Sequence, residues 1–177
     1  KDFSMYFPIQ HEGGGNLDKG LVLKWMAKQM GYENDKVFHN SLYDMGWLKR
    51  YNIKVNGTIH DTMFAAPLID ENQYSYSLNN LGEKYCGETK DETLLSQAAE
   101  AYGLNPKSEM YRLPAKYVGP YGEQDAALTL KLWGVFKELI KVENVSKIYD
   151  LETSLIPILL DMRYKGVPVD LDVAEKV

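Results

Sequence analysis

The chain has 177 residues, of which 45% are hydrophobic and 12% aromatic, and its formal net charge is −5 at pH 7. This composition excludes wholesale disorder and is sufficient for a buried core, with room for one domain and one further element. The negative charge argues against a broad electrostatic grip on a nucleic-acid backbone, although it leaves open an enzyme that approaches phosphates through metal ions.

Targeting and redox features are sparse. No apolar run approaches the roughly 20 residues of a membrane span, and the first residues lack the pattern of a signal peptide. The single cysteine, Cys86, cannot form an internal disulfide and is expected to pack. We therefore expect an intracellular protein with no membrane contact. Because the chain begins at Lys1 and stops in a polar run, we also expect it to be a piece of a longer protein.

The first half of the chain predicts short strands that alternate with helices. Residues 5–9 favour a strand, and Asn16 is a candidate N-cap for a helix that ends at Gly31. Residues 37–38 predict a buried strand that leads directly into a second helix. After another extended piece near residues 58–60, Asp61 is placed to cap the next helix.

The second half is mostly helical. Helices are predicted at about residues 77–85 and 92–102, followed by an irregular crossing over 104–118. A long helix is predicted from about Tyr121, with an apolar stripe of Leu130, Trp133, Phe136 and Ile140. A last helix covers about 146–164 and ends at Gly166. The pattern indicates an α/β domain followed by a transition to a different, helical region.

Two short motifs of the same shape carry the functional signal. Asn40 precedes Asp44 by four residues, and Tyr121 precedes Asp125 by four. On a helix this spacing puts both side chains on one face. Two carboxylates brought together from such motifs could hold divalent metals, since hard cations such as magnesium prefer oxygen ligands. Asp44 and Asp125 are the candidate ligands, although an aspartate in a first helical turn commonly serves the helix dipole or a cap.

Tyr121 discriminates more sharply between functions. At the start of the long helix its phenol would lie over the face of Asp125, where it could orient a metal-bound water. The alternative is a half-buried tyrosine that packs at a helix start.

The three histidines lack zinc-ligand spacing, and the Gly13–Gly15 run lacks the lysine of a phosphate-binding loop. A small basic patch of Lys49, Arg50 and Lys54 could meet DNA phosphates or be solvated.

Taken together, these motifs resemble a known family. Asn40-x-x-x-Asp44, Asp61-Thr62 and Tyr121-x-x-x-Asp125 are similar to the second and third exonuclease motifs, with their spacer, of the 3′-5′ proofreading exonuclease domain of family A DNA polymerases. That domain belongs to the tyrosine branch of the DEDD nucleases. The segments Phe7-Pro8-x-x-His11 and 75–81 most resemble phage-encoded members. Further on, the resemblance is to the start of the polymerase portion, at Glu152, Pro157, Met162, Gly166-Val167 and Asp170.

The resemblance implies specific roles. Asp125 and Asp44 would be metal ligands and catalytic residues, and Tyr121 would position the attacking water. Asn40 would lie near the terminal nucleotide, and Tyr43 would touch a frayed base, unless Tyr43 simply packs. The implied cofactors are two divalent metal ions, Mg or Mn, in the intact domain.

The resemblance also implies a fold and a domain division. The fold would be ribonuclease H-like, with a central mixed sheet flanked by helices, its N-terminal strands missing, and a helical C-terminal extension. Residues 1–143 would form the exonuclease domain without its first motif, and residues 144–177 would begin the polymerase region. If the protein is phage-encoded, its location would be the host cytoplasm.

One expected motif is absent. The family carries an Asp-x-Glu pair on its opening strand, where side chains two apart share a face, but here Asp2 is followed at that spacing by Ser4. Asp150-Leu151-Glu152 spells the pair at the other end of the chain. Because helical spacing surrounds it, its two carboxylates are expected to diverge. We therefore expect these 177 residues alone to bind metal weakly and to have little nuclease activity.

The functional hypothesis is metal-assisted hydrolysis of the last phosphodiester of DNA by a proofreading exonuclease. Its partners would be a single-stranded or frayed 3′ end of DNA and the remainder of a polymerase chain. Two alternatives stay open: a non-catalytic exonuclease-like module that contributes structure or DNA contact within a polymerase, and an RNA-trimming exoribonuclease of the same nuclease branch.

Overall fold

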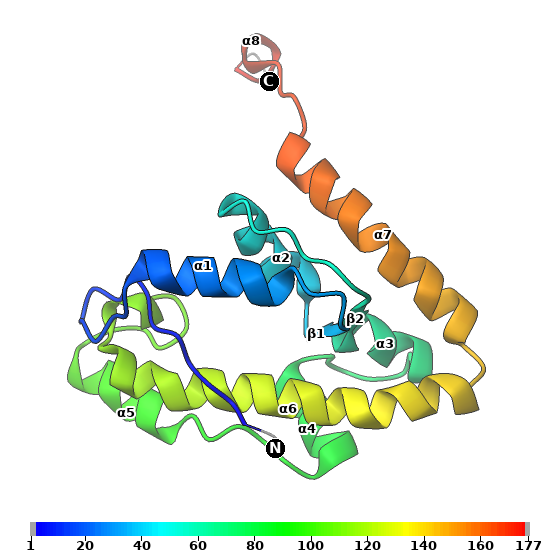
Figure 1. The fold of residues 1–177 in the computed structure, drawn as a ribbon, viewed down its shortest axis with the longest axis horizontal. Helices are drawn as coiled ribbons and strands as arrows, with labels where there is room; N and C mark the ends of the chain where they lie inside the picture. Colours follow the sequence, from blue (N-terminus) through cyan, green and yellow to red (C-terminus); the bar gives the residue numbers. More distant parts are fainter. Residues whose placement is uncertain (1–2, 176–177) are drawn as a thin grey trace.

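A two-stranded parallel sheet lies among eight helices in the computed structural model, which describes residues 3–175 (Figure 1). Asp2, the one carboxylate near the expected first motif, lies outside the described residues. The elements follow the chain in the order α1 (Lys19–Met30), β1 (Lys36–Phe38), α2 (Ser41–Arg50), β2 (Ile59–Asp61), α3 (Thr62–Ile69), α4 (Leu78–Cys86), α5 (Thr93–Ala101), a 3₁₀ turn (Met110–Arg112), α6 (Ala115–Val142), α7 (Ser146–Lys165) and α8 (Leu171–Ala174).

Both strands run almost directly into helices. In the parallel register, Phe38 at the end of β1 pairs with Asp61 at the end of β2. The carboxyl ends of parallel strands meet at one edge of a sheet, so the N-termini of α2 and α3 emerge side by side. The sequence predicted both strands and both strand-to-helix junctions correctly.

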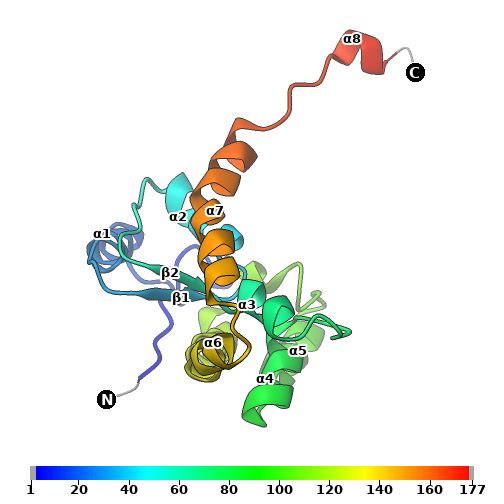
Figure 2. The ribbon, with the colours of Figure 1, turned by 90° about the vertical axis from the view of Figure 1, so that its right-hand side faces the viewer.

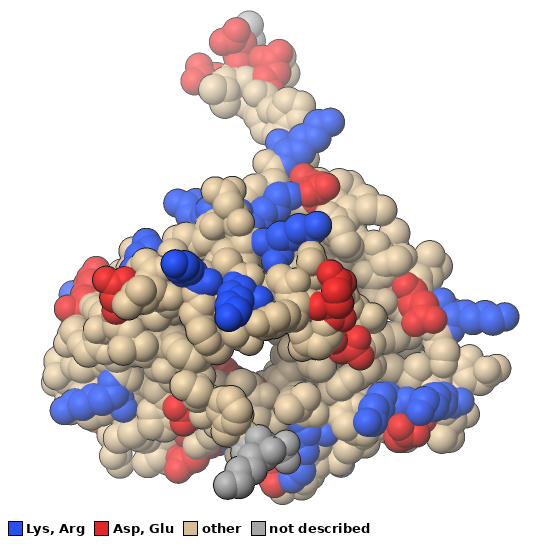
Figure 3. Space-filling model, in the orientation of Figure 1, with Lys and Arg blue, Asp and Glu red and all other residues tan. Residues whose placement is uncertain are grey.

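The predicted strand at residues 5–9 is wrong, and the larger mixed sheet is not found within residues 3–175. This segment is extended but pairs with no strand in the described chain. The Tyr6 N–H donates instead to a carboxylate oxygen of Glu123 at 3.2 Å, and the Pro8 carbonyl accepts from the Leu17 N–H at 2.9 Å. One edge of β1 therefore has no strand partner among the described residues. Figure 3 shows an opening between α1 and α6 on this side of the molecule.

Helix α6 is the main packing element, and it begins six residues earlier than predicted, at Ala115. Pro114 precedes it and Pro120 lies inside it, in the second turn, where a missing N–H removes one helical hydrogen bond. The predicted stripe is partly wrong, because Leu130 is exposed and Leu132 takes its place in the core. The main core cluster is formed by Ala65, Ala66, Leu78, Leu81, Leu128, Leu132, Phe136, Ile140 and Tyr149.

Helices α4 and α5 match their predicted positions within a residue or two. The Ser77 side chain caps α4, and α4 lies so close to α6 that a Cβ on Gly82 would stand 2.7 Å from Leu128 Cδ2 and 2.8 Å from the Glu88 carbonyl oxygen. Only glycine allows that approach without displacement of the neighbouring backbone. Cys86 is partly buried against the main core cluster.

Helix α1 is capped by Asp18, not by Asn16, and its apolar residues do not form a buried face. Val22 is its buried residue, whereas Leu21 and Trp25 are exposed. The Trp25 ring packs on the Phe7 ring, with ring centroids 4.6 Å apart. Figure 3 shows Lys and Arg side chains over the region of α1, although the whole chain is acidic.

Helix α7 leaves the end of α6 and packs against α2 and α3, in front of them in the view of Figure 2. Its Ile156 and Leu160 pack with Met45 of α2 in a second cluster. It ends at Gly166, as predicted, and α8 then extends away from the other helices (Figure 1). Within residues 3–175, none of the helices combines the length and the apolar character needed to cross a membrane.

Candidate active site

The N-terminus of α2 is fixed by a buried carboxylate from the neighbouring strand. Asp61 is fully buried, and its two oxygens accept backbone N–H groups from Asn40 (3.1 Å), Ser41 (2.6 Å) and Met63 (2.8 Å). One side chain thus binds the N-termini of both α2 and α3. The cap on α3 was predicted from the sequence, and the bonds to α2 were not. Asn40 adopts a left-handed conformation with φ 68°, which asparagine tolerates better than most residues. Its exposed side chain makes no cap bond, so its amide is free to meet a ligand.

Asp44 lies one turn into α2 and faces the other acidic groups. Part of its side chain reaches solvent, yet the surrounding protein withdraws water from the carboxyl group. This desolvation, together with the negative charges of Asp61 and Asp125, raises the pKa of Asp44 to about 6. The charge of Asp125 on α6 thus acts on the carboxyl group of Asp44 on α2, although the two residues are 81 positions apart in the numbering.

Tyr121 and Asp125 lie one turn apart on α6 and meet the same lysine. The Lys90 ammonium is 2.9 Å from the Tyr121 hydroxyl oxygen and 2.8 Å from Asp125 Oδ1. Burial alone would lower the pKa of Lys90, but its bonds to Asp125 and Tyr121 outweigh that effect and raise the pKa, which keeps the group charged. The predicted common face of Tyr121 and Asp125 is therefore present, although Tyr121 lies inside the helix and not at its start.

Lys90 was missed by sequence reasoning, and His39 was considered only as one of three histidines that lack zinc-ligand spacing. His39 Nδ1 is 2.8 Å from the Thr62 hydroxyl oxygen, but Nε2 is buried without a hydrogen-bond partner among the described residues. Desolvation lowers the pKa of His39, and the charges of Asp61 and Asp125 oppose that shift. His39 therefore lies within electrostatic range of Asp61 and Asp125. Its position next to Asn40 was the available signal.

Tyr43 and the predicted basic patch follow the Asn40–Asp44 motif or lie within it, and they differ in how far they are engaged in contacts within the chain. Tyr43 is exposed and does not pack into the core; its ring meets Trp47 edge to face, with centroids 6.5 Å apart. In the predicted basic patch, Lys49 pairs with Asp161 of α7, and Arg50 lies over the Trp47 ring at 6.0 Å. The patch is thus partly committed to contacts within the chain.

The Asp150–Glu152 pair lies on a helix, as the spacing of its neighbours predicts. Asp150 and Glu152 lie on α7, both exposed. Neither is among the groups that shift the pKa of Asp44.

A divalent cation fits part of this arrangement. Asp125 Oδ1 is a buried oxygen without a well-aligned hydrogen bond in the described chain, although the Lys90 ammonium neutralises its charge. The Asp44 carboxyl is acted on by two like charges, those of Asp61 and Asp125, which a cation would offset. The oxygens of Asp61, in contrast, are occupied by backbone N–H groups. No group of three or more His, Cys, Asp or Glu residues in residues 3–175 is arranged to hold a metal ion. The described chain offers two candidate carboxylates, those of Asp44 and Asp125, and a cation at Asp125 would compete with Lys90.

Comparison with known proteins gives the family. A family model described as 3′-5′ exonuclease, from family A DNA polymerases, matches residues 16–141. The chain belongs to this exonuclease domain family. The matched range includes both five-residue motifs, Asn40–Asp44 and Tyr121–Asp125, and the segment of Lys90. The resemblance on which the sequence interpretation was based is therefore confirmed.

The similar proteins are phage and bacterial DNA polymerases. The exonuclease domain is 39% identical over 170 residues to a DNA-directed DNA polymerase of Pseudomonas phage M6, covering 94% of this chain and 26% of that protein. It is 33% identical over 172 residues to DNA polymerase DpoZ of Vibrio phage phiVC8, covering 87% of this chain and 27% of that protein. DNA polymerase I of Rhizobium leguminosarum is 29% identical over 189 residues, with 97% and 18% covered. The chain thus spans about a quarter of the length of the curated phage relatives it matches.

Proposed function

We propose that this exonuclease domain hydrolyses the 3′-terminal phosphodiester of DNA with the help of divalent metal ions held by Asp44 and Asp125. What supports the proposal is that the charge of Asp125, one turn from Tyr121 on α6, contributes to the raised pKa of Asp44 on α2. Family members generally use divalent metals, and the oxygens of Asp61 are occupied by three backbone N–H groups, which leaves Asp44 and Asp125 as the candidate ligands. When bound, the metals would supply an activated water and stabilise the leaving oxygen.

The chain's own residues would bind and orient the substrate. Tyr121 would donate to the attacking water, because its hydroxyl lies over the same helix face as Asp125. Asn40 would bind the terminal nucleotide through its free amide. Tyr43 would stack on the terminal base, since its ring is exposed and it directly precedes Asp44 in α2.

The substrate would be a single-stranded or frayed 3′ end. A mispaired terminus costs less to unstack than a paired one, so it reaches a single-strand site more often. This preference would let the domain proofread DNA made by the remainder of the same chain. The relatives' names, which are those of DNA polymerases, support that proposal.

The domain division proposed from the sequence is residues 1–143 for the exonuclease domain and residues 144–177 for the start of the polymerase region. The end of the family match at residue 141 supports this boundary. We also propose that the complete domain has the ribonuclease H-like sheet, with further strands pairing at the free edge of β1. The unpaired edge and the adjacent opening support that arrangement (Figure 3).

The 177 residues alone would bind metal weakly and show little nuclease activity. Two carboxylates and a phenol are fewer oxygen ligands than two divalent cations require. The complete protein that carries this chain is therefore the right material for an activity test.

The test compares Asp125→Asn and Asp44→Asn with wild type in the complete protein, in magnesium. Both variants should lose digestion of a 3′-labelled single strand and of a duplex with a mispaired 3′ end, while folding normally. Asp150→Asn with Glu152→Gln is the matched control, because these exposed acids should not contribute. Digestion that persists in Asp125→Asn would contradict the proposal. A wild-type preference for RNA over DNA would favour an exoribonuclease, and an inactive wild type would favour a non-catalytic module.

A further inference from the structure

Lys90 is buried at the proposed site and touches both residues of the Tyr121–Asp125 motif. Its side chain is 10% exposed, its ammonium lies 2.9 Å from the Tyr121 hydroxyl oxygen and 2.8 Å from Asp125 Oδ1, and the ammonium stands 4.3 Å from the centre of the Tyr121 ring. Glu92 lies farther away, at 3.9 Å. Exposed surface ion pairs contribute little, but a shielded ammonium shared by two polar groups constrains both of them.

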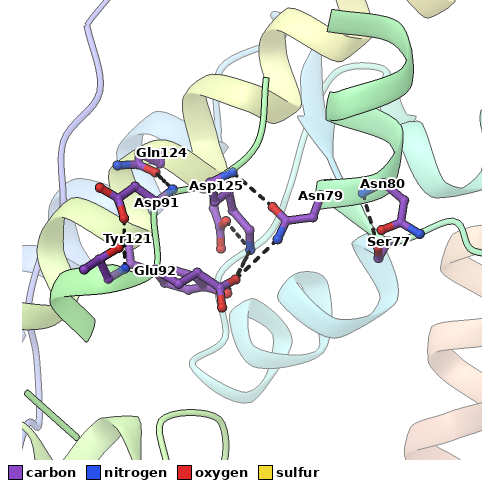
Figure 4. Close-up of polar contacts among 10 residues, drawn as sticks. Ser77, Asn79, Asn80, Asp91, Glu92, Tyr121, Gln124 and Asp125 are labelled. Atoms are coloured by element: carbon purple, nitrogen blue, oxygen red, sulfur yellow. Dashed lines mark hydrogen bonds and ion pairs between the residues drawn. The ribbon is translucent and has the colours of Figure 1, made fainter. Parts of the chain in front are cut away.

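The segment that carries Lys90 is fastened on both sides. The Lys90 N–H donates to Asn79 Oδ1 of α4 at 3.1 Å, and the next N–H, that of Asp91, donates to Gln124 Oε1 of α6 at 2.8 Å. Figure 4 shows Asn79 on one side of this segment, and Gln124, Tyr121 and Asp125 on the other. The backbone position of Lys90 is therefore set by α4 and α6.

We propose that Lys90 is a positioning residue for the exonuclease reaction, which holds the Tyr121 hydroxyl beside Asp125 and sets the direction of its proton. The inference rests on the proposed function. An ammonium has three donors and no acceptor, so Lys90 donates to a lone pair of the phenol oxygen. The phenol's own hydrogen is then left to donate, and a water beside Asp125 is its natural acceptor. Without Lys90, the hydroxyl would turn to accept or donate elsewhere.

A different role for the same contact would give opposite results. If Lys90 only neutralised Asp125 in place of a cation, its removal would tighten metal binding and leave the action of Tyr121 intact. The experiments are chosen to separate these two roles.

The first experiment measures exonuclease kinetics of the complete protein on a 3′-labelled single strand in magnesium. Lys90→Met keeps the length of the side chain and removes its donors, and we expect kcat to fall about tenfold to a hundredfold with KM within about threefold. Lys90→Arg should restore part of the loss. Lys131→Met is the control, because Lys131 makes an exposed ion pair with Glu88 and should leave kcat unchanged.

A double-mutant cycle makes the test specific for Tyr121. In a Tyr121→Phe background, Lys90→Met should lower kcat little further, because the group it positions is absent. Equal losses in both backgrounds would overturn the proposal. So would a gain in activity together with tighter manganese binding by calorimetry.

The second experiment needs no activity and uses the 177-residue chain labelled with ¹³C at the tyrosine Cζ. The Tyr121 resonance, assigned by its loss in Tyr121→Phe, should shift in Lys90→Met and stay in place in Lys131→Met. An unmoved resonance in Lys90→Met, in a chain whose circular dichroism is that of wild type, would overturn the positioning role. If Lys90→Met does not fold, Lys90→Gln takes its place. A wild-type complete protein without exonuclease activity would refute the proposed function, whereas this spectrum would still decide the contact.

Discussion

The buried Asp61 carboxylate should be the most sensitive single group for the stability of the site. Three backbone N–H groups, from Asn40, Ser41 and Met63, donate to it at 2.6–3.1 Å. An amide in Asp61→Asn has one acceptor oxygen and an NH₂ group that would face a donor. It can retain at most the two bonds to Oδ1, and the Ser41 N–H is left buried without an acceptor.

The magnitude follows from those bonds. A buried N–H without an acceptor costs about 1–3 kcal/mol, and the two bonds that remain lose the assistance of the negative charge. We therefore expect Asp61→Asn to lower the free energy of unfolding by about 3 kcal/mol. For a chain of this size, that corresponds to a drop of roughly 6–12 °C in Tm.

The assay is urea unfolding followed by circular dichroism, with a thermal melt of the same samples. Asp70→Asn is the control, because the Asp70 carboxylate also accepts a backbone N–H, from Asn72 at 3.0 Å, but is solvent-accessible and should matter far less. A loss in Tm of less than about 2 °C in Asp61→Asn would refute the reasoning that one carboxylate holds both helix starts.

Three other predictions concern the packing and the charge of the same region. Gly82→Ala should lower the free energy of unfolding by about 1–3 kcal/mol, because the new Cβ would meet a backbone carbonyl. Gly134→Ala should stabilise α6, because a Cβ there meets nothing within 4 Å. Urea titrations compare the two variants. Tyr149→Phe should cost about 1–2 kcal/mol in the same assay, because the Tyr149 hydroxyl accepts the buried Asp61 N–H at 3.0 Å, and an unchanged midpoint would contradict that contact. In metal-free buffer with chelator, protonation of Asp44 favours the folded chain, since its folded pKa of about 6 lies above the ordinary 3.8. The free energy of unfolding should therefore fall as pH rises from about 4 to about 6. Asp44→Asn should flatten this part of the pH profile.

The sequence predicted the parts of this molecule that local chemistry controls. The junction of β1 with α2, the cap at Asp61 and the stop at Gly166 all follow from a few adjacent residues. The spacing of the two motifs also predicted that Tyr121 and Asp125 share a face. These features depend on helix geometry and capping, which are readable over short ranges.

The errors arose where packing partners decide the outcome. A strand pattern at residues 5–9 needs a neighbouring strand, and none is found for it in the described chain. The start of α6 was set too late because two prolines and mixed charge in residues 104–118 indicated an irregular crossing, whereas Val118 packs in a buried cluster and the helix continues through Pro120. Lys90 could not be found from the sequence, because a lysine in a charged loop is usually solvated and only the tertiary contacts with α4 and α6 bury it.

The most direct test of the central claim is a titration of the 177-residue chain with Mn²⁺, followed by paramagnetic broadening of its backbone amide resonances. Amides near Asp44 and Asp125 should broaden before those elsewhere in the chain, and Asp125→Asn should weaken the effect at both places. Early broadening near Asp150 and Glu152, with the resonances around Asp44 and Asp125 still sharp, would contradict a shared cation site.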